Sequence, residues 1–396
     1  MRRLRVLVLD HTAREGGAEL ALLRVAEVLR SDDTVQLRAL LFADGPLRAR
    51  LISAGVDTAV LPLDEDIATA SRDRVIGGAA RSALGAARYV PRLARAIRGS
   101  SADLVVANSL KSAVFAFLAA PLAGRRWVWQ LHDRLATDYL PAPLAAVMRL
   151  ISVLGPRVIV ANSRATMETL PARARRKTVV AYPGLQQEAF TRAERTSGDA
   201  VVGILGRVSP TKGQREFLEA AAIVGAGRQD VRFIVIGGAL FGEDDYETEL
   251  RGLAQRLGVA DRVEFTGWIS DAPARLRDLS LLVHASPIPE PFGQVIVEAM
   301  AAGVPVVATA AGGVPEILDE DGDRSGAPWS TTATGVLVLP GDSTALARAM
   351  ESVLDDPIAA SSRARAARDD AQRRFTIAQT AHTVLRAWRD GVTRSV

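Results

Sequence analysis

Short, uninterrupted apolar runs recur along this sequence, and each is followed by a stretch with the apolar period of a helix. Leu4–Leu9, Leu104–Ala107 and Val158–Ala161 are such runs, and Ala18–Leu29 is one of the amphipathic stretches. Strands that are apolar without alternation are typical of a parallel sheet covered by helices on both faces. The first half of the chain is therefore expected to be a doubly wound α/β domain, with its site at the carboxyl ends of the strands.

The same order of elements starts again after a polar stretch that runs from Gln186 to Asp199. Val201–Leu205 and Val231–Ile236 are the next strand-like runs, and Gly213–Val224 is the helix expected between them. The polar stretch has no apolar period, so we interpret it as a linker between two α/β domains.

The length of the chain, 396 residues, also favours two cores over one. We expect an N-terminal domain at residues 1–188 and a C-terminal domain at residues 195–374. Both are expected to be Rossmann-like and to face each other across a cleft. A last helix at about residues 376–390 is expected to pack back on the first domain.

Several classes of site and location are excluded. Neither G-x-G-x-x-G nor G-x-x-x-x-G-K-[ST] occurs, and the chain has no cysteine for disulfides, thiolate zinc sites or a cysteine nucleophile. The longest apolar run, Ala113 to Ala123, is about half the length of a membrane-spanning helix. The apolar part of the N-terminus is too short for a secretory signal. We expect a cytoplasmic protein that is at most attached to the inner face of the cell membrane.

The most informative segment lies between His284 and Ile317. It contains two carboxylates, Glu290 and Glu298, and Gly293 precedes the predicted helix that carries the second. The free N–H groups and the dipole of that helix's first turn favour an anion such as a diphosphate. Glu298 can accept hydrogen bonds from two ribose hydroxyls, and Glu290 can face the sugar. The alternative interpretation, which would be preferred for an isolated pair of glutamates, is purely structural. In that case Glu298 would be a first-turn charge that interacts with the helix dipole, and Glu290 would be a solvated loop residue.

This segment resembles the E-x7-E signature of family 4 of the retaining glycosyltransferases, which have the GT-B fold. The resemblance extends from Gly16 to roughly residue 390. It implies that the N-terminal domain is the acceptor side and that the C-terminal domain binds the nucleotide sugar. It also implies that Glu290 lies near the hydroxyls of the transferred sugar, and that Glu298 holds the donor ribose.

Further donor-binding residues follow from the same resemblance. The backbone amides of Phe292, Gly293 and Gln294 would meet the sugar or the β-phosphate. Gly16 and Gly17, between the first strand and the first helix, resemble the glycine loop that lies against the donor phosphates in the family. The alternative for these two glycines is a tight turn before a helix.

Two cations and a histidine complete the predicted site. Arg207 and Lys212 resemble the family's diphosphate clamp, because a guanidinium offers a bidentate fork and an ammonium a compact charge for the leaving diphosphate. Lys212 is one of only three lysines. The alternative for Arg207 and Lys212 is a surface loop with ordinary basic residues. His132 follows the strand at Trp127–Leu131 and matches the family's active-site histidine near the transferred sugar, and Asp133 is a candidate to orient it.

The resemblance implies a hexosyltransferase that takes a sugar from a UDP- or GDP-linked donor and needs no metal or other cofactor. The bias toward arginine is typical of a GC-rich bacterial genome. We expect an acceptor hydroxyl on a bacterial cell-surface glycan or glycolipid, and no nucleic acid partner. One alternative is transfer to a soluble natural product or a small thiol precursor. The other is a catalytically inactive protein that binds nucleotide sugars.

A row of arginines precedes the strand-like run at Leu104–Ala107. Its members fall on one side of a predicted helical segment: Arg74, Arg81, Arg88, Arg92 and Arg95. Their apolar neighbours are Leu84, Val90, Leu93 and Ile97. Such a row is expected on a helix that contacts anionic lipid or a lipid-phosphate acceptor, and the alternative is a solvated face.

Three weaker signals are interpreted as structural. The acidic cluster Glu243-Asp244-Asp245 is expected in a solvated loop. Trp268 is expected in the core, and the alternative is that it lines the pocket of the nucleobase. The clusters at 64–66 and 319–321 are expected in surface loops without a metal.

Overall fold

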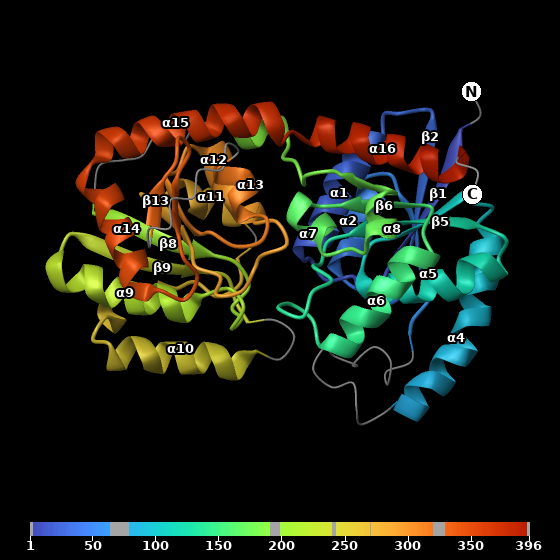
Figure 1. Cartoon of the computed structure of the whole chain (residues 1–396), viewed down its shortest axis with the longest axis horizontal. Coiled ribbons are helices and arrows are strands. Elements are labelled where there is room, and N and C mark those ends of the chain that lie inside the picture. Colours follow the sequence, from blue (N-terminus) through green and yellow to red (C-terminus); the bar gives the residue numbers. More distant parts are fainter. Residues whose placement is uncertain are drawn as a thin grey trace. The chain divides into compact units, whose positions relative to one another are not determined.

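The chain folds into two compact units. A computed structural model describes residues 3–63, 79–190, 199–239, 243–269, 271–319 and 329–393. The first unit comprises Met1–Gly184 and Ile377–Val396, and the second comprises Leu185–Thr376. Each unit is built on one seven-stranded sheet (Figure 1). The chain ends in two successive helices, Pro357–Arg374 and Ile377–Thr393, and only the second of them belongs to the first unit.

The first sheet is parallel throughout, with the strand order β3-β2-β1-β4-β5-β6-β7. Its strands are β1 (Leu4–Asp10), β2 (Val35–Leu41), β3 (Asp57–Val60), β4 (Leu104–Ala107), β5 (Arg126–Leu131), β6 (Val158–Ala161) and β7 (Thr178–Val180). The strand order reverses between β1 and β4. In an open α/β sheet, that reversal opens a crevice for ligands at the carboxyl ends of the strands.

Helices cover both faces of the first sheet. One layer consists of α1 (Gly17–Leu29), α2 (Pro46–Ser53) and α16 (Ile377–Thr393). The other contains α4 (Ala79–Gly99), α5 (Leu110–Leu122), α6 (Ala142–Leu154) and the short α8 (Ala172–Arg175). The short α7 (Arg164–Glu168) follows β6. Because alternate residues of β1 enter these two cores, the strand is apolar on both faces, as its sequence indicated.

The last helix packs tightly on the first sheet. Trp388 is fully buried, and a Cβ atom at Gly391 would lie 2.6 Å from Cγ2 of Val128. Glycine therefore allows α16 to approach β5 closely, and a side chain at 391 would force the two apart.

The second sheet has the order β10-β9-β8-β11-β12-β14-β13, and only the edge pair β13–β14 is antiparallel. Its strands are β8 (Ala200–Leu205), β9 (Val231–Ile236), β10 (Val263–Phe265), β11 (Leu281–His284), β12 (Val306–Thr309), β13 (Trp329–Thr331) and β14 (Val336–Val338). Here the order reverses between β8 and β11. The doubly wound α/β architecture that the apolar runs predict is confirmed in each unit.

Helices also cover the second sheet. They are α9 (Gln214–Gly227), α10 (Asp244–Arg256), α11 (Ala272–Arg277), α12 (Gln294–Ala302), α13 (Val314–Leu318), α14 (Ser343–Asp355) and α15 (Pro357–Arg374), with the 3-10 turns η1 (Gln187–Phe190) and η2 (Ala260–Arg262). The polar stretch that we interpreted as a linker begins with η1, which belongs to the second unit. Residues 191–198, which continue that stretch, lie outside the described residues.

Lys177 has a structural role that the sequence did not suggest. Its Nζ atom donates hydrogen bonds to the carbonyl oxygens of Val153 and Pro156, at 2.8 and 2.7 Å. These carbonyls lie at the end of α6, where backbone acceptors have no partner within the helix. Burial, with a smaller effect of Arg157, lowers the pKa of Lys177 to about 8.

Some residues singled out in the sequence lie outside the described part of the chain. They are Arg74, the acidic cluster at 64–66, and Glu320 and Asp321. The helix that carries the rest of the arginine row is α4, and the side chain of Arg81 is not described. No helix within the described ranges has the length and apolar character needed to span a bilayer.

Candidate active site

The predicted lysine and the first glutamate of the signature meet in the second unit. Lys212 lies in the loop after β8 and Glu290 in the loop after β11, on either side of the point where the strand order reverses. The Nζ atom of Lys212 is 2.7 Å from Oε1 and 2.9 Å from Oε2 of Glu290. The structure therefore brings together two residues that are 78 positions apart in sequence.

A histidine side chain also faces Glu290. His284, the buried last residue of β11, has its Nε2 atom 3.8 Å from Oε2 of Glu290, which is a charge contact and too long for a hydrogen bond. Burial opposes ionisation of Glu290, but Lys212 and His284 outweigh it and hold the pKa of this carboxyl well below its usual range. Glu290 is therefore ionised. Sequence reasoning missed His284, although it ends a strand beside the signature.

Glycines fix the backbone of both loops. The backbone N–H of Gly313 donates to the carbonyl of Glu290 at 2.8 Å, and a Cβ atom at Gly312, where φ is +64°, would lie 2.0 Å from the same oxygen. Gly213, where φ is +81°, would place a Cβ atom 2.0 Å from the carbonyl oxygen of Ala285. A side chain at either glycine would therefore displace the loop that carries Glu290 or Lys212.

The second glutamate lies on α12, next to the helix N-terminus. Gly293 precedes the helix with a φ of +110°, and the side-chain amide of Gln294 donates to Oε1 of Glu298 at 3.2 Å. The side chain of Phe292 is buried and packs edge-to-face on Phe375, with ring centroids 5.8 Å apart. A contact of Phe292 with a ligand would therefore use its backbone and not its side chain.

Arg207 does not join the Lys212–Glu290 pair. Its guanidinium forms an ion pair with Glu243, and the hydroxyl of Ser209 donates to the same carboxylate at 2.8 Å. The side-chain amide of Gln214 holds the loop by donating to the carbonyl of Arg207 at 2.9 Å. The expectation of a solvated loop is therefore wrong for Glu243, which pairs with the loop after β8, and Asp244 and Asp245 begin α10.

In the first unit, polar residues follow four neighbouring strands. Asp10 ends β1, Asn108 follows β4, His132 follows β5 and Asn162 follows β6. Their hydrogen bonds form a chain across the carboxyl edge of the sheet. Of these four residues the sequence prediction included only His132. The other three could have been found in the sequence, since each is a polar residue directly at the end of an apolar run.

The hydrogen bonds of Asn108 fix the state of His132. The Nδ2 atom of Asn108 donates to Oδ2 of Asp10 at 2.7 Å, so its Oδ1 atom is the one that faces Nε2 of His132, at 3.1 Å. Because Oδ1 can only accept, Nε2 carries the proton. Burial lowers the pKa of His132, against the opposing charges of Asp133 and Asp10, so the ring is neutral. Its Nδ1 atom is then an acceptor.

Asp133, the candidate to orient this ring, accepts a hydrogen bond from the hydroxyl of Tyr139 at 3.2 Å. The ring of His132 contacts the side chain of Asn108.

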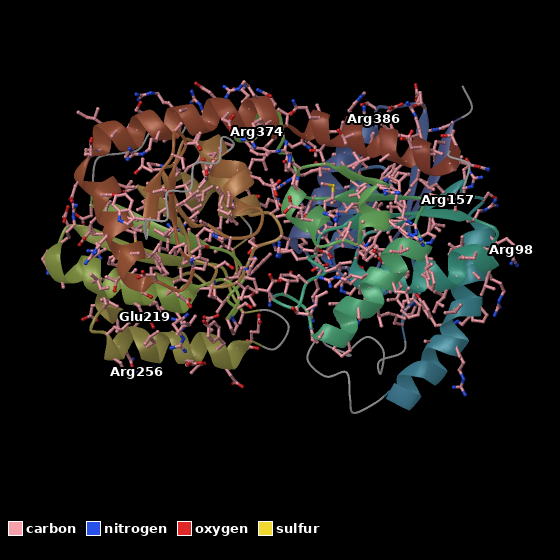
Figure 2. All side chains as sticks on the ribbon, viewed as in Figure 1. Arg98, Arg157, Glu219, Arg256, Arg374 and Arg386 are labelled. Atoms are coloured by element: carbon pink, nitrogen blue, oxygen red, sulfur yellow. The ribbon has the colours of Figure 1, made fainter. Side chains whose placement is uncertain are left out.

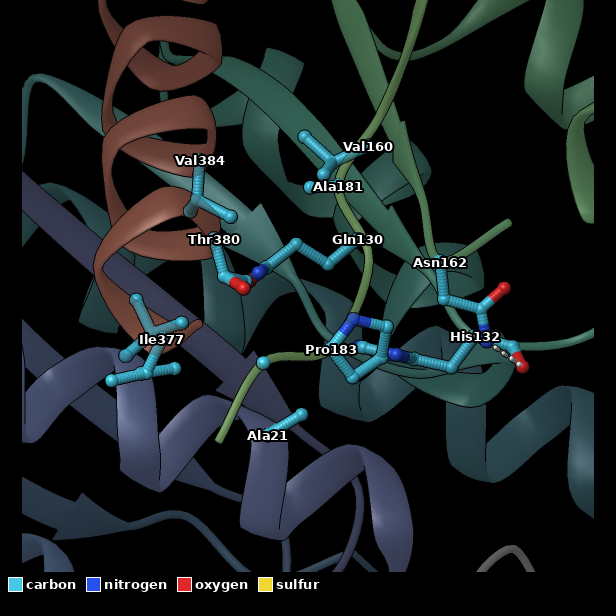
Figure 3. Close-up of a pocket in the computed structure, with 12 residues that line it drawn as sticks. Ala21, Gln130, His132, Val160, Asn162, Ala181, Pro183, Ile377, Thr380 and Val384 are labelled. Atoms are coloured by element: carbon cyan, nitrogen blue, oxygen red, sulfur yellow. Dashed lines mark hydrogen bonds between the residues drawn. The ribbon is translucent and has the colours of Figure 1, made fainter. Parts of the chain in front are cut away.

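A small pocket opens beside His132, between the sheet and α16 (Figure 3). The buried acceptors Gln130 Oε1 and Asn162 Oδ1 have no hydrogen-bond partner among the described residues, so the pocket suits ordered water. Its lining residues are Ala21, Val25, Gln130, His132, Val160, Asn162, Ala181, Pro183, Gly184, Ile377, Thr380 and Val384.

The glycine loop contains a buried carboxyl group. Gly16 precedes α1 and Gly17 begins it, and a Cβ atom at Gly16 would lie 2.5 Å from Oε2 of Glu19. Burial raises the pKa of Glu19 to about 8, and the charge of Asp10 adds to the effect. At neutral pH the carboxyl group of Glu19 is therefore protonated in most molecules. Its neighbour Asp10 accepts a hydrogen bond from Asn108.

Asp10, His11 and Glu19 offer metal-ligand atoms that lie within 4.8 Å of one another. We assign no metal to this cluster. Asp10 already accepts hydrogen bonds from Asn108 and from the backbone N–H of His11, and Glu19 holds a proton.

Replacing Asn108 by leucine is expected to release the ring of His132 from one tautomer. In the wild type, ¹⁵N NMR of histidine-labelled protein should show Nε2 protonated and Nδ1 unprotonated near neutral pH, whereas Asn108→Leu should show a mixture. Turnover should fall on the order of tenfold, because a misoriented ring of His132 no longer holds its hydrogen-bond partner in the productive position. Asn162→Leu is the matched control, since the side-chain amide of Asn162 donates to the backbone carbonyl of His132 and not to its ring. An unchanged His132 spectrum in Asn108→Leu would overturn the assignment.

Comparisons with known proteins identify the family. A sequence model described as Glycosyl transferases group 1 matches residues 186–372, and one described as Glycosyltransferase Family 4 matches residues 16–188. The two matches run through both units and include every residue of the predicted site. This chain belongs to glycosyltransferase family 4. The resemblance carried by the E-x7-E segment is thereby confirmed.

Two curated proteins illustrate the range of relatives of this glycosyltransferase. It is 31% identical to the 2-deoxystreptamine glucosyltransferase of Streptomyces kanamyceticus over 241 residues, which are 60% of this chain and 54% of that protein. It is 29% identical to the D-inositol 3-phosphate glycosyltransferase of Stackebrandtia nassauensis over 310 residues, 70% of this chain and 66% of that one. The chain thus spans between about half and two thirds of these relatives.

Solved structures confirm the GT-B fold. Anabaena HepE in complex with UDP-glucose is 29% identical, with a TM-score of 0.80 over 97% of this chain and 99% of HepE. Sucrose-phosphate synthase from Thermosynechococcus elongatus is 18% identical, with a TM-score of 0.75 over 98% of each chain, and supports the fold alone.

Proposed function

We propose that this glycosyltransferase moves a hexose from a nucleoside-diphosphate sugar to an acceptor hydroxyl with retention of the anomeric configuration. The observation that carries the proposal is the ion pair between Lys212 and Glu290, because Glu290 lies in the loop before α12 and its anion-favouring N-terminus. HepE, which resembles this chain over nearly its whole length, has been solved with UDP and with UDP-glucose. UDP-glucose is therefore the first donor to test.

In the second unit, the proposed donor site uses the predicted residues in distinct roles. The backbone amides at residues 292–294 and the ammonium of Lys212 bind the diphosphate, and Glu298 accepts hydrogen bonds from the ribose. Glu290 accepts from hydroxyls of the transferred sugar, for which its ionised state is suited. A phosphate would compete with Glu290 for Lys212. Donor binding is therefore coupled to a rearrangement of this ion pair.

Trp268 is a candidate contact for the nucleobase. The expectation that it lies in the core is wrong, because 59% of its surface is exposed. It follows β10 and packs beside the turn after β9, where a Cβ atom at Gly238 would lie 2.9 Å from its backbone nitrogen. An exposed indole at the carboxyl edge of the sheet offers a flat surface on which a base can stack.

In the first unit, His132 is proposed to receive a hydrogen bond from the transferred sugar at Nδ1, since Nε2 already donates to Asn108. Gly16 and Gly17 are proposed to approach the donor phosphates, as their resemblance to the family's glycine loop implies. The proton on Glu19 suits that role, because a neutral carboxyl group under this loop does not repel a diphosphate.

The proposed reaction takes place on one face of the sugar. The bond between the anomeric carbon and the diphosphate oxygen breaks, and a bond to the acceptor oxygen forms on the same side. The acceptor's proton passes to an oxygen of the departing diphosphate. Lys212, Arg207 and the N-terminus of α12 stabilise the charge on that diphosphate, for which Arg207 must exchange Glu243 for phosphate oxygens.

The acceptor is proposed to be a hydroxyl of a bacterial cell-surface glycan or glycolipid. A soluble natural product is the second candidate, and the likeness to a 2-deoxystreptamine glucosyltransferase favours it. An inactive nucleotide-sugar-binding protein is the third possibility, and the intact set of site residues speaks against it.

The proposal is tested by thermal unfolding with UDP, GDP, ADP and dTDP, each alone and as hexose conjugates. A ligand at a hundred times its Kd should add about 2.7 kcal/mol of stability. Glu298→Ala should lose most of this gain, whereas Glu264→Ala, which removes an exposed carboxylate in the same unit, should keep it. Product anomers, read by NMR, then report retention. Binding without donor hydrolysis or transfer would favour the inactive protein, and no binding at all would overturn the proposal.

A further inference from the structure

The outer surface of the first unit carries an apolar patch. Helices α4, α5 and α6 lie side by side over one face of the first sheet (Figure 1). Five large apolar side chains on α5 and α6 point away from the core and are between 42% and 63% exposed: Leu118, Leu122, Val147, Leu150 and Leu154. Single exposed leucines are ordinary on protein surfaces, but a group on two adjoining helices marks an interaction surface.

A row of arginines borders this patch. Arg88, Arg92 and Arg95 are exposed on α4 at spacings of four and three residues, which places them on one side of the helix. One helical turn further, the guanidinium of Arg98 donates to the carbonyl of Leu122 at 2.7 Å. Arg98 lies at the edge of the unit in Figure 2. This hydrogen bond joins the arginine row directly to the apolar patch.

The apolar partners of the arginines are not those that the sequence suggested. Val90, Leu93 and Ile97, which follow the arginines on α4, are buried against the sheet. They are the core side of the helix. The exposed apolar surface beside the arginines comes instead from α5 and α6, which no periodicity within α4 could reveal.

The charge of this surface has one sign. Helices α4, α5 and α6 contain no aspartate or glutamate. We call the exposed residues of α4, α5 and α6 named above the basic apolar face. A second copy of the chain is a poor occupant, because pairing two such faces would bring arginine rows together. The occupant must therefore supply both anionic groups and apolar surface.

We propose that the basic apolar face binds the surface of an anionic lipid bilayer. The arginines lie at the level of the lipid phosphates, and the leucines enter the boundary between headgroups and acyl chains. The exposed leucines lie on the later turns of α5 and α6, toward the edge where the next strands begin. Membrane binding by this face is a property beyond the hexosyl transfer proposed above.

The test is co-sedimentation of the full chain with vesicles. The protein should bind vesicles of equal parts phosphatidylglycerol and phosphatidylcholine, bind pure phosphatidylcholine far less, and be released by added salt. Replacing Arg88, Arg92 and Arg95 by glutamine should weaken binding roughly fivefold per arginine, on the order of 100-fold in all. Replacing Leu122, Leu150 and Leu154 by serine should weaken it at least as much, because the apolar contact is lost.

Matched controls come from the second unit. Replacing the exposed arginines at positions 256, 348 and 365 by glutamine changes the net charge by the same amount. Replacing Ile223, Leu339 and Ile358 by serine removes three exposed apolar side chains. Both should bind vesicles like the wild type. All variants should retain the wild-type unfolding temperature, which shows that they are folded. Equal binding by wild type and leucine variant, or no binding of the wild type to anionic vesicles, would overturn the proposal.

Discussion

Replacing Lys212 by methionine is expected to lower kcat by about 10²- to 10³-fold, the usual cost of removing one charge-stabilising group at a transition state. Lys212 is the ammonium nearest to Glu290, and both lie in loops at the reversal of the second sheet. Without it, the departing diphosphate loses a compact positive charge that a neutral side chain cannot replace. The measurement is the steady-state rate of UDP release from UDP-glucose, with and without acceptor.

A control separates lost chemistry from lost structure. Lys212→Met leaves the carboxylate of Glu290 partly buried beside His284 without its main counter-charge, which destabilises the fold locally. Adding Glu290→Gln removes that charge, so the double variant should regain stability but remain slow. Arg215→Met, which breaks the exposed ion pair with Glu249 nearby, should leave kcat within about twofold. A fast Lys212→Met enzyme would contradict the proposed role.

Replacing Glu19 by glutamine is expected to stabilise the protein above neutral pH and to change little in mild acid. The pKa of Glu19 is raised by burial and by Asp10, from 4.5 to about 8. In the unfolded chain the same carboxyl ionises near its ordinary value. The wild type therefore loses stability as pH rises from about 4.5 to about 8, because only the unfolded state releases the proton.

Glutamine mimics the protonated carboxyl and removes this dependence. Since each tenfold change in proton affinity is worth about 1.4 kcal/mol, the difference between variant and wild type should grow by a few kcal/mol over that range. Urea unfolding at a series of pH values measures it. Glu168→Gln, at an exposed position of α7, should show a difference that does not vary with pH. A constant difference for Glu19→Gln would mean that Glu19 is ionised in the folded protein.

Parts of the candidate site could be predicted because they are local in sequence. Glu290, Gly293 and Glu298 belong to one loop and one helix, so the chain order alone places a carboxylate on each side of a helix N-terminus. His132 could be found because it ends an apolar run of a parallel sheet. Asn108 and Asp10 have the same position at neighbouring strands, and they were missed because neither residue type has a chemical signature of its own.

The rest of the site could not be predicted because it depends on which strands are neighbours. Arg207 was expected to act beside Lys212, yet it pairs with Glu243, 36 residues away, because β8 lies next to β9. The buried apolar side of α4 and the exposed leucines of α5 and α6 are similar in composition. Only the packing of the helices on the sheet decides which of them faces solvent.

The sequence by itself determined the fold class, the family and the residues at the N-terminus of α12, since strand runs and short motifs depend on neighbours along the chain. Tertiary structure alone decided the contact of Lys212 with Glu290 across 78 residues and the tautomer of His132. It also decided that α16 returns to the first unit, beside the pocket of His132. The physical reason is that charge, burial and hydrogen bonding act between residues that are close in space. The order of the strands in each sheet decides which residues that are distant in sequence come close together.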